Sequence, residues 1–220
     1  GRGTDGMMPP AAGGSEDEGD TVPLGAEHGA ADLGGRVCQY CYVWQPLRAK
    51  HCHECERCVL RFDHHCFWVG GCVGANNHRV FLWYLAVQTA AVAWAASASL
   101  GMMRPRPTAE RWLEDNALAL LVALVACACL FFIFPLLCFH SFLAATNQTT
   151  YELTSRERVH YFRSVPSNVL APFNRGVAAN TRSFCLGGGG GEEDRMPSRE
   201  ELKAISESET FWDNRYYSCC

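Results

Sequence analysis

The sequence predicts a mostly α-helical membrane protein in which a small metal-stabilised, cysteine-rich domain precedes two transmembrane helices and a cytosolic tail. Two observations support this fold class. The chain of 220 residues contains two uncharged apolar runs of 24 residues each, and seven of its 13 cysteines fall within the 35 residues from Cys38 to Cys72. A helix of about 20 apolar residues can cross a bilayer, and so dense a cysteine cluster indicates disulfides or bound metal.

Charge is distributed unevenly along the chain. The net charge is −4, but residues 1–35 carry one base and seven acids, and residues 187–220 carry four bases and eight acids. Both terminal segments are rich in glycine and polar residues, so we expect them to be disordered. The segment 36–186 between them has 14 bases and eight acids. The acidic balance of the whole chain argues against a nucleic-acid-binding protein.

The two apolar runs predict transmembrane helices at 80–103 and 116–140, joined by a loop at 104–115. The alternative is a buried helical hairpin of a soluble protein, but uncharged runs of this length are unusual in soluble helices. The flanking segments 36–79 and 141–186 each contain more Lys and Arg than the loop. By the positive-inside rule, both flanks face the cytosol and the loop faces the lumen.

The cysteines between Cys38 and Cys72 occur in three Cys-x2-Cys pairs interleaved with histidines. Such a pair places two sulfurs on one tetrahedral zinc ion, so three of them are a strong zinc signal. An odd number of cysteines with interleaved histidines disfavours a disulfide framework. Two zinc ions need eight ligands, and this segment offers seven Cys and four His. If each ion takes three Cys and one His, one thiol is left over.

The natural candidate for the leftover thiol is Cys66, which follows Asp63, His64 and His65 and belongs to no Cys-x2-Cys pair. An imidazole that is oriented by a carboxylate promotes formation of the nucleophilic thiolate. Asp63, His64 and Cys66 would then be orienting group, base and nucleophile. In the alternative interpretation, Cys66 is a structural thiol and His64 is a spare zinc ligand.

The full pattern is Cys-x2-Cys-x9-His-Cys-x2-Cys-x2-Cys-x4-Asp-His-His-Cys-x5-Cys, followed by an apolar span. It resembles the cysteine-rich domain of the DHHC protein S-acyltransferases (palmitoyltransferases). Residues 149–152 read Thr-Thr-Tyr-Glu and match the Thr-Thr-x-Glu motif of that family, and Asn180 with Phe184 resembles its C-terminal Asn/aromatic motif. The resemblance covers residues 36–186.

The resemblance implies short β-hairpins and loops around two structural zinc ions. The implied ligands are Cys38, Cys41, His51 and Cys58 for one ion and Cys52, Cys55, His65 and Cys72 for the other. It also implies that Cys66 takes a long acyl chain from acyl-CoA, such as palmitoyl-CoA, and passes it to cysteines of membrane-associated proteins. His64, polarised by Asp63, would be its base. Candidate contacts for the CoA phosphates are Arg48, Lys50 and Arg61.

Two departures from the family carry further expectations. Family members usually have two spans before the cysteine-rich segment, whereas 35 polar residues precede it here, so the chain looks like a fragment that lacks those spans. Phe67 replaces the Pro that commonly follows the Asp-His-His-Cys motif in the family.

Residues 146–153 resemble plant members of the family, which predicts an endomembrane protein of the Golgi, vacuole or ER. The competing hypotheses are a catalytically inactive, membrane-tethered zinc module that binds partners and a zinc-finger ubiquitin ligase.

Overall fold

The computed structural model describes residues 35–186 and 195–208. The chain divides into two compact units, and the second of them is Val80–Phe142. The first unit combines the described residues before this segment with the described residues after it. Most of the predicted disorder, at 1–35 and 187–220, lies outside the described residues.

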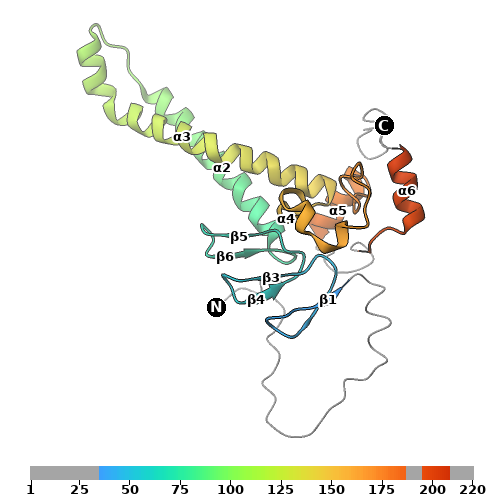
Figure 1. The fold of residues 1–220 in the computed structure, drawn as a ribbon. Coiled ribbons are helices and arrows are strands. Elements are labelled where there is room, and N and C mark those ends of the chain that lie inside the picture. Colours follow the sequence, from blue (N-terminus) through green and yellow to red (C-terminus); the bar gives the residue numbers. More distant parts are fainter. Residues whose placement is uncertain (1–34, 187–194, 209–220) are drawn as a thin grey trace, which may run out of the picture. The chain divides into compact units, whose positions relative to one another are not determined.

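Three antiparallel β-hairpins form the N-terminal part of the first unit (Figure 1). They pair β1 (Arg36–Val37) with β2 (Trp44–Gln45), β3 (Lys50–Cys52) with β4 (Arg57–Val59), and β5 (His64–Cys66) with β6 (Gly71–Val73). An isolated two-stranded hairpin is at best marginally stable, and each strand here has only two or three residues. The expected short hairpins are confirmed, and they need cross-links to persist.

Short helices form the C-terminal part of the same unit. They are α4 (Thr150–Thr154), the 3-10 helices η1 (Arg156–Arg158) and η2 (His160–Phe162), α5 (Val177–Leu186) and α6 (Arg199–Ser208). Their connections bury an apolar core that also includes a residue from the hairpin region. The buried members are Leu47, Val159, Tyr161, Phe162, Val165, Val169, Phe173 and Leu202.

Helix α6 corrects part of the disorder predicted for residues 187–220. Ser198 and Glu201 form reciprocal hydrogen bonds at its start, which is the geometry of a capping box. Leu202 is 4% exposed and packs into the apolar core. The tail is acidic overall, but Leu202 and Ile205 form an apolar face of α6 that the average composition does not reveal.

The second unit contains most of two long helices, α2 (His78–Met102) and α3 (Ala109–Thr146). Only 11% of the most apolar window of each helix is buried. A core helix of a soluble protein would be mostly buried, so the soluble-hairpin alternative does not fit. Small and aliphatic residues of both helices line an apolar groove between them, including Ala91, Ala95, Val122 and Ala126.

Helix α3 is longer than the span predicted at 116–140. Its 38 residues correspond to about 57 Å, well beyond the roughly 30 Å of a bilayer core. Thr108 caps the start by accepting a hydrogen bond from the N–H of Arg111. Asn116 holds the loop between α2 and α3, because its Oδ1 accepts a hydrogen bond from the N–H of Arg104 and its Nδ2 donates one to the carbonyl of Arg104. Local capping therefore extends the helix into a segment that the apolar pattern excluded.

Candidate active site and metal centres

Strand alternation distributes the expected zinc ligands between two sites. Successive side chains of a strand point to opposite faces, whereas directly opposed residues of paired strands share a face. His51 of β3 lies opposite Cys58 of β4, and the next residue, Cys52, points to the other face. His65 of β5 lies opposite Cys72 of β6. The β3–β4 and β5–β6 hairpins thus each supply one opposed His–Cys pair, and Cys52 links the β3–β4 hairpin to the site that contains His65.

The first site brings four ligand atoms within 4.8 Å of one another, from Cys38, Cys41, His51 and Cys58. The distance from Cys41 Sγ to His51 Nδ1 is 3.2 Å. The backbone N–H of Cys41 donates to Cys38 Sγ at 3.4 Å, and Gln45 Nε2 donates to Cys58 Sγ at 3.1 Å. Hydrogen bonds of this kind orient the side chains that ligate a metal.

The second site has the same composition, with Cys52, Cys55, His65 and Cys72. The Sγ atoms of Cys52, Cys55 and Cys72 lie 3.7, 3.3 and 3.7 Å from His65 Nδ1. The sulfurs of Cys55 and Cys72 are 3.4 Å apart. This separation is far longer than the roughly 2.05 Å of a disulfide bond.

Both clusters fit zinc. A tetrahedral ion with Zn–S of about 2.3 Å and Zn–N of about 2.0–2.1 Å holds its ligand atoms roughly 3.3–3.8 Å apart. Every cysteine in the described part of the chain is free of disulfides. Burial raises the pKa of Cys58 to about 12, so this thiol ionises at neutral pH only when a cation replaces its proton. The two clusters are the ligand sets that the family resemblance implies.

Cys66 and His64 lie on the face of β5 opposite to the zinc ligand between them, because they occupy alternate positions of one strand. Cys66 is 7% exposed. Its partner across the hairpin is Gly71, where an added Cβ would meet nothing within 4 Å. The space beside Cys66 on the neighbouring strand is therefore open.

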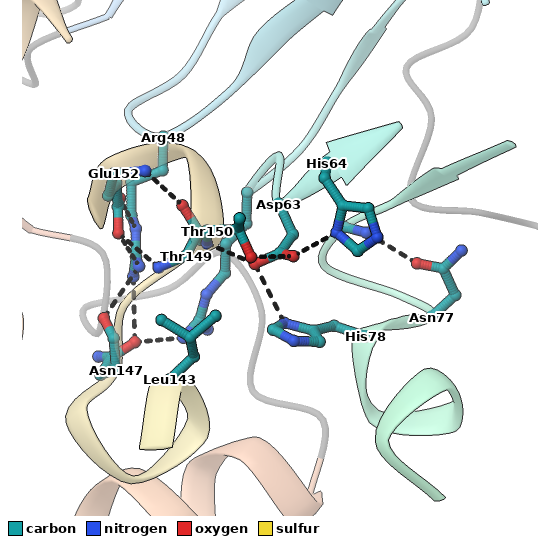
Figure 2. A network of polar contacts seen from close by, with 12 residues as sticks. Arg48, Asp63, His64, Asn77, His78, Leu143, Asn147, Thr149, Thr150 and Glu152 are labelled. Atoms are coloured by element: carbon teal, nitrogen blue, oxygen red, sulfur yellow. Dashed lines mark hydrogen bonds and ion pairs between the residues drawn. The ribbon is translucent and has the colours of Figure 1, made fainter. Parts of the chain in front are cut away.

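Asp63 immediately precedes β5 and is 1% exposed. Its Oδ2 accepts hydrogen bonds from His64 Nδ1 at 2.6 Å and Thr150 Oγ1 at 2.8 Å, and its Oδ1 accepts from the Thr150 N–H at 2.8 Å (Figure 2). Burial by itself would raise the pKa of Asp63, but the His64 hydrogen bond, the charge of His78 and the Thr150 N–H outweigh it. The pKa is lowered to about 2. Asp63 is therefore a fixed carboxylate at neutral pH.

His64 has the properties of a base. Its side chain is 26% exposed, so the ring is close to solvent while Asp63 is not. Burial lowers the pKa of His64, but the hydrogen bond and charge of Asp63, together with Cys66, outweigh it and raise the pKa above its usual value. A raised pKa makes the imidazole a stronger proton acceptor. His64 therefore contacts Asp63 on one side and is influenced by Cys66 on the other, and the catalytic roles of the three residues stay a prediction.

The Thr-Thr-Tyr-Glu segment at 149–152 is built as a helix start. The hydroxyl of Thr149 accepts from the N–H of Glu152 at 3.2 Å, and the carboxylate of Glu152 accepts from the N–H of Thr149 at 2.9 Å. This capping box fixes the first turn of α4. The intervening Thr150 then presents both its N–H and its hydroxyl to Asp63.

Arg48 corrects a prediction, because it is not placed to contact a phosphate. Its side chain is 0% exposed, and its Nε and Nη2 donate to the two carboxylate oxygens of Glu152 at 2.7 and 2.8 Å. It also donates to Asn147 Oδ1 at 3.1 Å and to Asn147 O at 3.0 Å. Its guanidinium carbon lies 4.4 Å from the centre of the Phe173 ring. Arg48 therefore belongs to a buried ion pair.

Lys50 and Arg61 are partly exposed. The Lys50 ammonium lies 4.5 Å from the Phe62 ring centre and 4.2 Å from that of Tyr151, and burial lowers its pKa. Arg61 donates a hydrogen bond to Asn147 Oδ1. Their role as phosphate contacts stays a prediction.

Several buried polar residues that support these sites could not be predicted from the sequence. Gln45 donates a hydrogen bond to Sγ of the zinc-site residue Cys58, and the Tyr161 hydroxyl donates to Glu152 Oε1 at 2.9 Å. Neither lies in a recognisable spacing pattern. The one local signal was the Thr-x-x-Glu spacing at 149–152, which is typical of a helix start.

Comparison with known proteins supports this geometry. The DHHC palmitoyltransferase family model matches residues 32–157. Protein S-acyltransferase 10 of Arabidopsis thaliana is 40% identical over 84% of this chain and 52% of its own length. Palmitoyltransferase ZDHHC12 of Homo sapiens is 39% identical over 78% of this chain and 63% of its own, and Protein S-acyltransferase 8 of Arabidopsis thaliana is 33% identical over 68% and 39%.

The chain therefore spans about half of the first relative and less than two thirds of the other two. The family match covers the zinc ligands, the Asp-His-His-Cys strand and the Thr-Thr-Tyr-Glu segment together. The chain belongs to the DHHC palmitoyltransferase family.

Proposed function

We propose that the protein is a protein-cysteine S-acyltransferase, which moves a long-chain acyl group from acyl-CoA through a Cys66 thioester to cysteines of membrane-associated proteins. One observation carries the proposal: Cys66 is set apart from both zinc clusters and shares a strand face with His64, whose Nδ1 is 2.6 Å from Asp63. Six of the seven clustered cysteines have a metal-binding arrangement, and the seventh has the neighbours of a nucleophile.

The first half-reaction forms the Cys66 thioester. Asp63 holds Nδ1 of His64, which directs Nε2 to take the proton of the Cys66 thiol. The sulfur attacks the thioester carbonyl of acyl-CoA and a new C–S bond forms. The bond to the CoA sulfur then breaks, and CoA leaves with the proton that His64 held. A positioned acid–base group of this kind contributes about 10²–10⁴-fold to rate.

The second half-reaction repeats the exchange. A cysteine thiol of the protein substrate gives its proton to His64 and attacks the Cys66 thioester. The acyl group moves to the substrate sulfur, and Cys66 leaves and recovers the proton. One thioester replaces another in each half, so positioning and thiolate formation are the main tasks of the site. Zinc ions, when bound, supply structural cross-links between the hairpins that hold this strand.

The proposed setting is an endomembrane, at the Golgi, vacuole or ER, with the cysteine-rich domain facing the cytosol, where acyl-CoA is available. The excess of bases in residues 36–186 supports this orientation. An acyl chain favours an apolar surrounding by about 0.8 kcal/mol per buried methylene. Two exposed apolar helices supply such a surrounding when they lie in a bilayer.

The test is covalent labelling of the full chain in detergent micelles or vesicles. The parent and a Cys66→Ser variant are incubated with a labelled palmitoyl-CoA analogue and then with hydroxylamine, which cleaves thioesters. Label is expected on the parent, removed by hydroxylamine and absent from Cys66→Ser. A Cys185→Ser variant is the matched control, because Cys185 is an exposed thiol on α5. Equal labelling of Cys66→Ser and parent would overturn the catalytic assignment, and a parent that never labels would favour a non-catalytic zinc module.

A further inference from the structure

A second imidazole faces the buried carboxylate of the active site. His78, the first residue of α2, is 6% exposed, and its Nδ1 lies 3.9 Å from Asp63 Oδ1 (Figure 2). His64 and Thr150 bond the same carboxylate at 2.6 and 2.8 Å. The charge of His78 is also one of the influences that lower the pKa of Asp63, after the opposing effect of burial and the hydrogen bond from His64.

The position of His78 is set by the turn that follows the β5–β6 hairpin. The N–H of His78 donates to Gly74 O at 2.9 Å, and Asn77 Oδ1 accepts from the N–H of Gly74 at 2.8 Å. Asn77 Nδ2 in turn donates to Cys72 O at 2.8 Å. A Cβ on Gly74 would come within 2.7 Å of a Val59 methyl group, so this turn packs tightly against the neighbouring hairpin. The start of α2 is therefore tied to β6.

The ring of His78 is also held from the C-terminal side of the chain. Phe184 of α5 meets it edge to face, with ring centres 5.2 Å apart and planes at 82°. Asn180, one helical turn earlier on the same face, donates to Ala145 O at 2.7 Å. One residue after Phe184, the carbonyl of Cys185 accepts from Arg79 Nη1 at 2.8 Å. These two anchors fix α5 on either side of the Phe184 ring.

We propose that His78 is a positioning residue for the acyl-transfer reaction, which holds Asp63 in line with His64 while Phe184 fixes the His78 ring. The inference rests on the proposed role of Cys66. His64 and the Thr150 hydroxyl bond Oδ2 of Asp63, and the Thr150 N–H bonds Oδ1. The His78 ring lies beside Oδ1 at 3.9 Å, where a proton on its Nδ1 favours the ionised carboxylate and the ring itself limits rotation of the carboxylate. The Asn180 and Phe184 motif thereby acquires a physical role, because it connects α5 to the active-site carboxylate.

Three substitutions separate positioning from simple packing. His78→Asn keeps a polar N–H near the place of Nδ1 but removes the ring. His78→Leu has nearly the same size as the asparagine variant but no polar group. His78→Phe keeps an aromatic ring against Phe184 but loses the N–H. A positioning role requires the asparagine variant to be active and the other two to be slow, whereas a packing role requires the phenylalanine variant to be active and the other two to be slow.

The measurements are the rate of acyl-thioester formation at Cys66 as a function of acyl-CoA concentration, and the rate at which iodoacetamide alkylates Cys66. We expect His78→Leu and His78→Phe to slow both by about tenfold with little change in the KM for acyl-CoA, a smaller factor than the roughly 10²–10⁴-fold of a direct acid–base group. His78→Asn should stay within about threefold of the parent. His160→Phe is the control for a His-to-Phe change elsewhere in the same unit and should match the parent.

Zinc content and the thermal unfolding midpoint show which variants fold. If His78→Phe does not fold, the size-matched Asn and Leu pair still decides. Parent rates for all three variants, or a phenylalanine variant faster than the asparagine variant, would overturn the inference. The alkylation rate does not depend on acyl transfer. A parent that never forms a thioester would therefore refute the proposed function, and the alkylation rates of the three variants would still decide the role of His78.

Discussion

At the residue scale, the buried ion pair of Arg48 and Glu152 has a large energetic consequence. Both side chains are almost fully buried, and two parallel hydrogen bonds join them. Asn147 and Tyr161 satisfy further polar atoms of the pair. Removing one member of such a pair leaves an unpaired buried charge, which typically costs about 3–5 kcal/mol.

Glu152→Gln should therefore destabilise the protein strongly. The carboxamide has about the same shape but cannot neutralise Arg48. We expect the thermal unfolding midpoint of the detergent-solubilised protein to fall by several degrees, consistent with a loss of about 3–5 kcal/mol. Glu157→Gln is the control, because Glu157 is exposed in η1 and close in sequence. Equal midpoints for the two variants would refute a stabilising role for the pair.

The same residues show what a sequence can and cannot predict. The Cys-x2-Cys spacing pointed to two zinc sites and one spare thiol, but it left open which residues bind which ion. The division of the ligands followed from the family resemblance and agrees with the two clusters, and the roles of Asp63, His64 and Cys66 stay a prediction. The role predicted for Arg48 was wrong, because its partner is 104 residues away in the chain. Pairings between distant segments leave no trace in local spacing. Thr150 could be noticed as part of a motif, but its bond to Asp63 could not be derived.

At the scale of elements, the hairpins depend on their metal sites. Each has strands of two or three residues, and a two-stranded sheet of that length is not stable alone. Buried thiols that are crowded around one point are favourable only when they share a cation. The second site also carries β5, so its loss should displace His64 and Cys66 as well as the ligand between them.

Replacing one ligand should remove one zinc ion. We expect Cys72→Ser to bind one zinc per chain instead of two, measured by elemental analysis after gel filtration, and to lose labelling at Cys66 because β5 loses its cross-link. The Cys185→Ser variant should keep two zinc ions. If Cys72→Ser still binds two zinc ions, the assignment of this site is incorrect.

Helix ends were the least predictable elements. The apolar run of 116–140 marked a membrane-crossing segment, but α3 begins at Ala109 because Thr108 caps it and Asn116 holds the preceding loop. Helix α6 escaped prediction because its acidic composition outweighed the apolar stripe that includes Leu202. The mean hydropathy of a segment indicates whether it can cross a membrane. Capping residues and single buried side chains decide where its helix begins.

At the scale of the whole molecule, the proposed orientation puts both flanks of the membrane helices on the cytosolic side. Cys185 on α5 is exposed, and Thr108 lies in the loop between α2 and α3. In sealed vesicles with the cytosolic face outward, a membrane-impermeant maleimide should therefore label Cys185 directly. It should label a Thr108→Cys variant at residue 108 only after the vesicles are permeabilised.

Peptide-level mass spectrometry reads both positions in one sample. The parent, which has no thiol at residue 108, is the control for the new site. Labelling of residue 108 before permeabilisation, with Cys185 protected, would reverse the topology. The acyl-CoA supply would then lie on the wrong side for the proposed reaction.

The most direct test of the proposed function is a single-turnover reaction of the full chain with palmitoyl-CoA, followed by mass spectrometry of the peptide that contains Cys66. We expect a hydroxylamine-sensitive acyl group on Cys66, formed about 10²-fold more slowly when Asp63→Asn weakens the acceptor for His64 while both zinc ions are retained. An acyl group on any other cysteine, or an equal rate of formation on Cys66 in Asp63→Asn, would refute the role proposed for these residues.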